Sequence, residues 1–130
     1  MALREIIDNT VFNYFKNNEL RIVADMNTAE EDGNPLSADM YFVGIDIARI
    51  MGCSTRPRDK VSFHQKHGNF MPEGGYLDVR CKNGTIRKMR AIDFKAAISM
   101  ICSDPEQCLP LEDRMALIEY LCHLAKKYNI

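Results

Sequence analysis

Asn83-Gly84 stands between two runs of alternating apolar and polar residues, and no other feature constrains the folding of this chain as strongly. The first run covers residues 76–82 and the second covers residues 85–92. Alternation with a period of two is typical of β-strands, and Asn-Gly favours the two-residue type I′ turn that joins antiparallel strands. The sequence therefore predicts a β-hairpin over residues 76–92.

This turn also predicts how the two strands pair. If Asn83 and Gly84 are the two loop residues, Arg80 lies directly opposite Arg87. Like charges in opposed positions destabilise a strand pair, so an anion such as a phosphate backbone would help to explain them. A basic two-stranded ribbon also fits the major groove of DNA. The same pairing sets apolar residues against charged ones, which leaves a bulge or a slip open, and a solvated basic ribbon is the alternative interpretation.

Residues 40–53 predict a strand followed by a short helix. The run Tyr41-Phe42-Val43 favours a strand, Asp46 is placed to cap the helix, and Gly52 is placed to end it in left-handed geometry. Arg49 is expected to point away from the packing face of this helix. The apolar residues expected on that face are Ile47, Ile50 and Met51.

The segments before residue 40 predict a short helix, a hairpin and a loop. Residues 3–7 have the apolar spacing of an amphipathic helical start. Residues 11–15 and 20–24 are strand-like on either side of residues 16–19, whose composition is typical of a turn. Residues 26–39 are acidic and too rich in turn residues for an ordered element, so we expect an exposed acidic loop.

Two helices are predicted after the hairpin. Asp93 is placed to cap the first, and the second covers residues 110–128, with acidic residues in its first turn and lysines in its last. The expected inner faces are Phe94, Ala97, Ile98 and Ile101 in the first helix, and Leu111, Met115, Ile118, Leu121, Cys122, Ala125 and Tyr128 in the second. Residues 1–130 thus predict a single α+β domain: a small antiparallel sheet with β-hairpins, packed against short helices and a longer C-terminal helix.

Charge is distributed unevenly along the chain. Residues 49–95 contain eleven Lys and Arg against four Asp and Glu, whereas residues 1–48 contain three against nine. The net charge of -1 therefore conceals a basic middle third, and such a block favours phosphate binding over the alternative of a solubilising face. The candidate nucleic-acid-binding residues are Arg49, Arg56, Arg58, Lys60, Lys66, Arg80, Lys82, Arg87, Lys88 and Arg90.

Several other classes of protein are not indicated. No segment offers the roughly 18 uninterrupted apolar residues of a membrane span, and the start of the sequence lacks the pattern of a secretory signal. Five cysteines at irregular positions indicate reduced thiols rather than a disulfide framework. We therefore expect an intracellular protein with no membrane partner.

Metal binding and catalysis are the remaining chemical possibilities. Cys53, His64, His67 and Cys81 are residue types of a zinc site, but their spacing matches no usual two-knuckle pattern. The same thiols and imidazoles are also the types of a nucleophile and a base, yet no nucleophile elbow, phosphate loop or paired acid and base accompanies them. We expect no metal, no cofactor and no enzymatic activity.

Two segments resemble a known family. Residues 12–23 (Phe-Asn-Tyr-Phe-Lys-Asn-Asn-Glu-Leu-Arg-Ile-Val) and residues 41–54 resemble the amino-terminal domain of the BRO proteins, the baculovirus repeated open reading frame products. Relatives of these proteins occur in insect poxviruses and among phage antirepressors. The family pattern is an aromatic strand ending in Leu-Arg-Val-Val, then Phe-Val-Ala-Lys-Asp-Val-Ala, then Leu-Gly-Tyr-Ser. Here the matching positions hold Asp46, Ala48, Gly52 and Ser54, whereas Gly44, Ile45 and Cys53 depart from the pattern.

The resemblance is strongest over residues 11–100, and it implies a compact α+β nucleic-acid-binding domain of a large DNA virus or phage. Such a domain would act in viral regulation in the nucleus or cytoplasm of the infected cell, with DNA as the main expected partner and RNA as a second one. The alternative is a protein-interaction or self-assembly domain of the same fold that binds a host or viral protein, with Glu30-Glu31-Asp32 as a contact. A homo-oligomer would be one form of that alternative.

Overall fold

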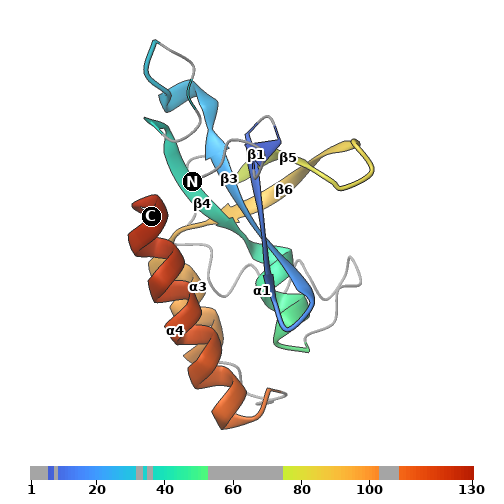
Figure 1. Cartoon of the computed structure of the whole chain (residues 1–130), viewed down its shortest axis with the longest axis vertical. Helices are drawn as coiled ribbons and strands as arrows, with labels where there is room; N and C mark the ends of the chain where they lie inside the picture. Colours follow the sequence, from blue (N-terminus) through green and yellow to red (C-terminus); the bar gives the residue numbers. More distant parts are fainter. Residues whose placement is uncertain (1–5, 8, 32–33, 35–36, 53–74, 103–108) are drawn as a thin grey trace.

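A curled antiparallel sheet carries helices on one side, so the predicted α+β class is confirmed (Figure 1). The computed structural model describes residues 6–7, 9–31, 34, 37–52, 75–102 and 109–130. The described strands are β1 (Ile6–Ile7), β2 (Thr10–Phe15), β3 (Asn18–Asp25), β4 (Asp39–Val43), β5 (Tyr76–Arg80) and β6 (Ile86–Ile92), in the sheet order β1-β2-β3-β4-β6-β5. The described helices are α1 (Gly44–Ile50), α3 (Phe94–Cys102), α4 (Leu111–Tyr128) and the 3-10 turn η2 (Met26–Thr28).

The first predicted hairpin is confirmed as β2 and β3. Phe15 pairs with Asn18, so only Lys16 and Asn17 form the turn. Both turn residues have positive φ, 48° and 67°, as a type I′ turn requires. The turn is therefore shorter than the four residues that composition indicated, because the chain tolerates left-handed geometry here without a glycine.

The segment expected to begin as a helix is instead a strand where it is described. Ile6 pairs with Val11 and Ile7 with Thr10 at the edge of the sheet. Two neighbouring isoleucines suit a strand as well as a helix, and β2 offers their backbone a partner that an isolated helical turn lacks. The helical prediction was wrong for these residues.

The acidic loop is more ordered at its two ends than its composition predicted. Asp25 caps η2 by accepting a hydrogen bond from the backbone N–H of Asn27 at 3.1 Å. The Thr28 hydroxyl donates to the Asp25 carbonyl at 2.7 Å and accepts from the Asp39 N–H at 2.7 Å, where β4 begins. Glu30 is exposed as expected, whereas Asp32 lies outside the described residues.

Helix α1 follows β4 directly, but the prediction that Asp46 caps it was wrong. The N-cap is Val43, no side chain caps the helix, and the Asp46 carboxylate is fully buried. The packing face of the helix is buried as predicted, Arg49 is exposed, and Gly52 ends the helix with a φ of 82°. The Asp46 carboxylate instead accepts hydrogen bonds from Arg21.

Helix α3 begins as expected, because Asp93 Oδ1 accepts a hydrogen bond from the Ala96 N–H at 2.8 Å. Helix α4 follows Pro110 and ends at Asn129, which has a φ of 56°. Its buried stripe is rotated from the predicted one: Leu117, Leu121, Leu124, Ala125 and Tyr128 are buried, whereas Leu111, Met115 and Cys122 are exposed.

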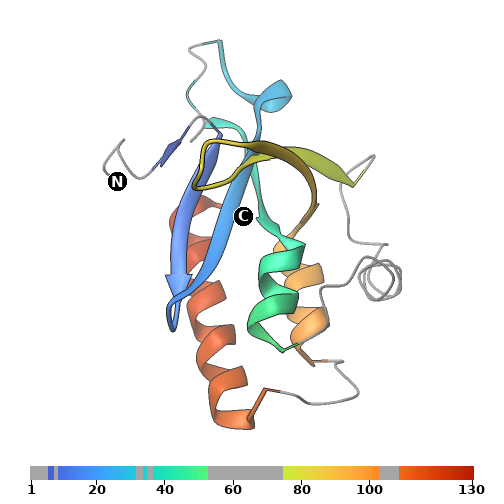
Figure 2. The same ribbon diagram turned by 90° about the vertical axis from the view of Figure 1, so that its right-hand side faces the viewer.

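The two faces of the sheet are covered by different elements. One face of β2, β3 and β4 packs with α1, α3 and α4 around a large apolar core that includes Phe42, Ile22 and Leu121. On the other face a smaller cluster forms inside the curl, where Val79 of β5 meets Val23 of β3. Figure 2 shows β5 and β6 crossing in front of the sheet, with α3 and α4 behind it.

Candidate nucleic-acid interface

Strands β5 and β6 with residues 81–85 form a two-stranded unit that we call the ribbon. The predicted hairpin is confirmed, but its register is not, because Arg80 pairs with Ile86 and Arg87 pairs with Val79. The loop is closed by hydrogen bonds from the Cys81 N–H to the Thr85 carbonyl at 2.7 Å and from the Gly84 N–H to the Cys81 carbonyl at 2.9 Å. Three residues, 82–84, therefore form the loop, with Gly84 at a φ of 89°.

The predicted pair of opposed arginines was wrong, because Arg80 and Arg87 lie on opposite faces of the ribbon. A shift of one residue in register moves side chains to the other face of a strand pair. The observed register brings the apolar residues together: Leu77, Val79, Met89 and Ala91 face the small core inside the curl. Burial of this apolar set favours the three-residue loop over the two-residue turn that Asn-Gly favours locally.

The outer face of the ribbon carries three cations, Arg80, Lys88 and Arg90. Lys88 Nζ lies 3.3 Å from Asp78 Oδ1 in an exposed ion pair. The Arg90 guanidinium lies 5.1 Å from the centroid of the Tyr76 ring, and its Nη2 donates to the Tyr76 hydroxyl at 3.1 Å. Arg80 Nη1 donates to the Gly84 carbonyl at 2.5 Å, which fixes this side chain along the loop.

Two side chains at the start of β2 tie the ribbon to the rest of the sheet, and we call Asn9 and Thr10 the clasp. Asn9 Nδ2 donates to the Asp78 carbonyl at 2.7 Å, and the Arg80 N–H donates to Thr10 Oγ1 at 2.9 Å. The Thr10 hydroxyl in turn donates to Asn9 Oδ1 at 3.1 Å. Thr10 is fully buried, so these bonds satisfy a polar side chain that water cannot reach. The clasp fixes the orientation in which the ribbon displays its outer face.

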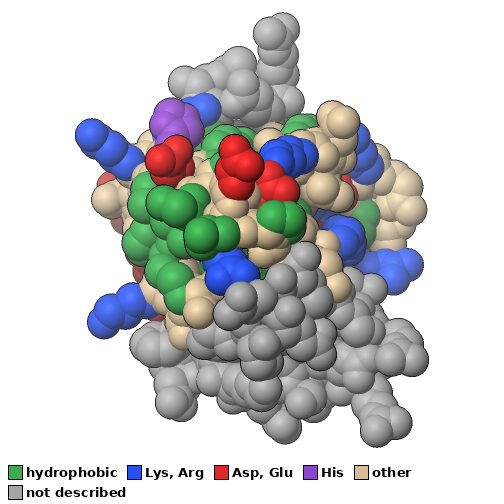
Figure 3. Space-filling model, turned by 90° about the horizontal axis from the view of Figure 1, so that it is seen from below, with side chains coloured by type: hydrophobic (Ala, Val, Ile, Leu, Met, Phe, Trp, Pro, Cys, Tyr) green, Lys and Arg blue, Asp and Glu red, His purple; other side chains and the backbone are tan. Residues whose placement is uncertain are grey.

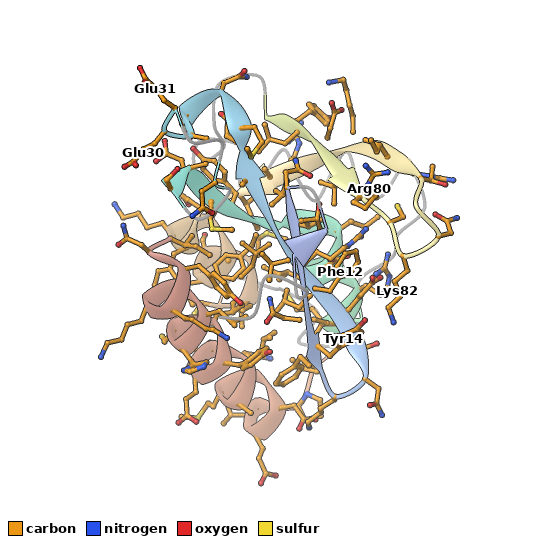
Figure 4. The ribbon with its side chains drawn as sticks, turned by 45° about the horizontal axis from the view of Figure 1, so that its top comes forward. Phe12, Tyr14, Glu30, Glu31, Arg80 and Lys82 are labelled. Carbon is orange, nitrogen blue, oxygen red and sulfur yellow. The ribbon has the colours of Figure 1, made fainter. Side chains whose placement is uncertain are left out.

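The tip of the ribbon lies over an aromatic side chain of β2. Lys82 Nζ is 4.7 Å from the centroid of the Tyr14 ring, within the range of a cation–π interaction, and Tyr14 is 44% exposed. A hydrogen bond with Tyr14, and then the electrostatic interaction with the same side chain, raise the pKa of Lys82 above its ordinary value. Figure 4 shows Tyr14 and Phe12 on the same part of the molecule as Arg80 and Lys82.

A buried ion pair lies beneath the ribbon and supports it. Asp46 Oδ2 accepts from the backbone N–H and the Nε of Arg21, both at 2.9 Å, and its Oδ1 accepts from Arg21 Nη2 at 2.8 Å. Burial alone lowers the pKa of Arg21, but the hydrogen bonds and the charge of Asp46 outweigh burial, so the pKa lies above its ordinary value. Arg21 Nη1 also donates to Cys81 Sγ at 3.7 Å, which joins this pair to the ribbon loop.

The remaining predicted cations are distributed as follows. Arg49 has a side chain that is 43% exposed, and its Nη1 lies 3.3 Å from Asp46 Oδ1, so it shares the carboxylate of the buried pair. Arg87 is exposed on the opposite face of the ribbon from Arg80. Arg56, Arg58, Lys60 and Lys66 lie outside the described residues. The structure thus brings together only part of the predicted basic face.

Sequence reasoning missed three residues of this region: Phe12, Tyr14 and Arg21. The alternation in β2 held a signal for the first two, because residues 12 and 14 share a face opposite to that of Val11. For Arg21 the signal was an aspartate, Asp46, among the apolar residues of a short helix. Such an acid is found buried only when it is paired, which predicts a basic partner.

The described residues add two further observations. They contain no group of three or more His, Cys, Asp and Glu side chains placed to hold a metal ion. Cys81, the one described member of the candidate zinc set, contacts Arg21, and the other three members lie outside the described residues. Among the described helices, none combines the length and the apolar composition that crossing a membrane requires.

Comparison with known proteins gives this chain no relative. No family model, curated protein or solved structure matches it. The resemblance to BRO domains thus stays a prediction from the sequence, and the function has to be inferred from the site itself.

Proposed function

We propose that this chain is a nucleic-acid-binding domain that contacts the phosphate backbone of DNA with the outer face of its ribbon. The observation that best supports this function is the alignment of Arg80, Lys88 and Arg90 on one face of a two-stranded unit. Two-stranded ribbons of this kind enter or lie along DNA grooves, and cations at their surface position the protein on the phosphates.

The contacts that Lys88 and Arg90 already make leave both side chains able to bind phosphate. The side chains of Lys88 and Asp78 are 73% and 61% exposed, and such an exposed ion pair contributes little stability, so a phosphate can replace the carboxylate. Arg90 gives one donor to Tyr76, whereas a guanidinium has five. Stacking on the ring also reduces the conformational entropy that Arg90 loses on binding.

The acidic residues of the domain support an orientation for the bound nucleic acid. In Figure 4, Glu30 and Glu31 lie at the upper left of the molecule, whereas Lys82 lies on its right-hand side. Asp25 and Asp39 pair across β3 and β4 near the acidic end. A polyanion would be repelled from this end and attracted to the ribbon, so we propose that DNA approaches from the tip side.

The role in the cell that we propose is viral regulation through DNA binding in the infected cell, in keeping with the resemblance to BRO domains. Contacts to phosphates alone do not distinguish DNA from RNA, so RNA is a second possible ligand. Tyr14 beside Lys82 adds an exposed aromatic ring at the edge of this surface.

A salt titration with charge-reversal variants tests this proposal. Labelled duplex DNA would be titrated with the wild type and with Lys88→Glu/Arg90→Glu at several salt concentrations. The variant is expected to bind more weakly, and the slope of log K against log salt to fall by about 0.9 for each phosphate that the variant no longer neutralises. The matched control is Lys126→Glu/Lys127→Glu, which changes the net charge equally on exposed positions of α4.

The control is expected to keep the slope of the wild type. Absence of salt-sensitive binding at low ionic strength would sink the proposal, and so would equal reductions of affinity in the two variants, because the ribbon would then have no special part. Repeating the titration with single-stranded DNA and with RNA identifies the preferred ligand.

A further inference from the structure

The outer face of the ribbon has an acid at its centre. Six side chains share this face, and they belong to Tyr76, Asp78, Arg80, Ile86, Lys88 and Arg90. Asp78 is the only acid among these six described residues, and it lies directly opposite Lys88 in the middle pair. Figure 3 shows acidic side chains beside one another at the end of the molecule seen from below. A carboxylate among cations opposes phosphate binding, so phosphate binding alone does not explain Asp78.

The carboxylate and the ammonium form one polar unit. Lys88 Nζ lies 3.3 Å from Asp78 Oδ1, and the two side chains are 73% and 61% exposed. The Asp78 carbonyl accepts a hydrogen bond from Asn9 at 2.7 Å, so the clasp holds the backbone at this position. A ligand that binds this face therefore meets a charged donor and a charged acceptor side by side.

The major groove of DNA presents the complement of this unit. It admits a two-stranded β-ribbon, and in a G·C pair the O6 acceptor of guanine lies beside the N4 donor of cytosine. These two atoms are hydrogen-bonded to each other, so they lie about 3 Å apart. Their separation is close to that of Lys88 Nζ and Asp78 Oδ1. The ammonium can thus donate to O6 while the carboxylate accepts from N4.

The groups beside these atoms distinguish G·C from A·T. An A·T pair also has an acceptor beside a donor, the O4 of thymine and the N6 of adenine. In G·C, the N7 of guanine gives the ammonium of Lys88 a second acceptor next to O6. In A·T, the ammonium would lie near the thymine methyl group, and the carboxylate of Asp78 near the N7 acceptor of adenine. Charges that lose water without gaining a partner lower the affinity for the wrong base pair.

We propose that Asp78 and Lys88 together recognise a G·C pair in the major groove of duplex DNA. This inference rests on the proposed function, in which Arg80 and Arg90 contact phosphates and so position the ribbon. On other sequences Lys88 contacts a phosphate, and at a matching site it stays beside Asp78 and contacts guanine. Contacts to bases add the specificity that contacts to phosphates lack. The major groove of an RNA duplex is too deep and narrow for side chains, so this recognition selects DNA.

Selection from duplexes with a randomised central block tests the inference. The purified chain is expected to enrich duplexes with G·C at a fixed position, and exchange of this pair for A·T is expected to weaken binding by about tenfold. Two base analogues then identify the groove. 7-Deazaguanine removes the N7 acceptor from the major groove and is expected to weaken binding. Inosine removes only the N2 amino group from the minor groove and is expected to leave the affinity unchanged.

Substitution of the acid gives the decisive comparison. Asp78→Ala removes a negative charge, so it is expected to raise the affinity for unselected duplexes. The same variant is expected to reduce the preference for G·C over A·T by about fivefold or more. Asp78→Asn is expected to move the preference toward A·T, because an asparagine amide pairs with N6 and N7 of adenine. The matched control Glu119→Ala removes the same charge at an exposed position of α4 and is expected to leave the preference unchanged.

The possible outcomes separate this inference from the proposed function. Salt-sensitive binding without a preferred base pair would overturn the recognition of G·C and leave phosphate binding intact. A preference that both substitutions of Asp78 leave unchanged would also overturn it, and so would a loss of affinity with inosine but not with 7-deazaguanine. Absence of binding to every duplex would overturn the proposed function and this inference with it. A thermal melt of each variant checks that the fold is intact.

Discussion

The two hairpins of this sheet share an alternating pattern but differ in how many of their faces are covered. In β2 and β3, Ile22 packs toward the helices and Val23 packs toward the inside of the curl, and both are fully buried. In the ribbon only the inner face is covered, and the outer face displays Arg80, Lys88 and Arg90. The local pattern thus specifies a hairpin in both places. Tertiary contacts decide which hairpin is covered on both faces and which keeps one face exposed.

The arginines of the two hairpins show the same contrast. Arg21 of β3 is 3% exposed and has a carboxylate that meets three of its N–H groups. Among the residues that the structure describes, Arg90 of the ribbon has a tyrosine hydroxyl and an aromatic ring as partners, which engage few of its donors. A guanidinium that is paired in the interior stabilises the fold. A guanidinium on a strand with one exposed face can still bind a ligand.

The largest effect on stability is expected at the buried pair of Arg21 and Asp46, beneath the hairpin of β2 and β3. Asp46→Ala leaves the buried Arg21 guanidinium and backbone N–H without an acceptor, and it should lower the free energy of unfolding by about 3–5 kcal/mol. Urea denaturation measures this decrease. The double variant Arg21→Met/Asp46→Leu should be destabilised much less than the two single variants together, because it leaves no unpaired charge. A decrease below about 1 kcal/mol for Asp46→Ala would contradict the buried pair.

A smaller effect is expected where the two hairpins meet. Thr10→Val keeps the shape of the side chain but removes the acceptor for the Arg80 N–H, at a cost of about 1–3 kcal/mol. Hydrogen exchange at the Arg80 amide should become faster in this variant. The control is Thr85→Val, an exposed position directly after the loop, expected to change stability by less than about 0.5 kcal/mol. Unchanged exchange at Arg80 would show that the clasp does not hold the ribbon.

The two turns are expected to respond differently to their local geometry. Gly84 has a φ of 89° and no heavy atom within 4 Å of an added Cβ, so Gly84→Ala tests conformation without a clash. It should cost about 1–2 kcal/mol through left-handed strain alone. Asn17→Gly, at a φ of 67° in the other hairpin, should change stability by less than about 0.5 kcal/mol. Equal effects on thermal unfolding would argue against this difference.

The smallest effect on stability is expected on the displayed face. Lys88→Glu/Arg90→Glu should change the free energy of unfolding by less than about 1 kcal/mol, since exposed charges contribute little to folding. The same variant is expected to lose DNA affinity, so thermal unfolding and the salt titration should diverge. If this variant lowers the free energy of unfolding as much as Asp46→Ala does, Lys88 and Arg90 stabilise the fold, which contradicts the prediction.

Much of the fold could be predicted because local signals and tertiary structure agree there. The Asp93 cap, the termination at Gly52 and both hairpins depend on neighbouring residues alone. The register of the ribbon could not be predicted in this way. Asn83-Gly84 favours a two-residue turn, but burial of Val79 inside the curl requires the three-residue loop.

Other features could not be predicted because their cause is distant in the sequence. Aspartate is a residue type that often caps helices, yet the partner of Asp46 is Arg21, which lies 25 residues earlier on strand β3. On α4, Leu111 and Met115 continue an apolar pattern, but the sheet faces a stripe rotated toward Leu117 and Leu124. Spacing alone identifies two apolar stripes on this helix and does not say which one is buried.

The clasp has a consequence for the behaviour of the chain at high concentration. A free strand edge presents alternate N–H and C=O groups that can recruit a strand from another molecule and begin aggregation. On β5 the Asp78 carbonyl and the Arg80 N–H, two groups of that edge, are already occupied by Asn9 and Thr10. By closing its curl with side chains, the protein withdraws this edge from intermolecular pairing.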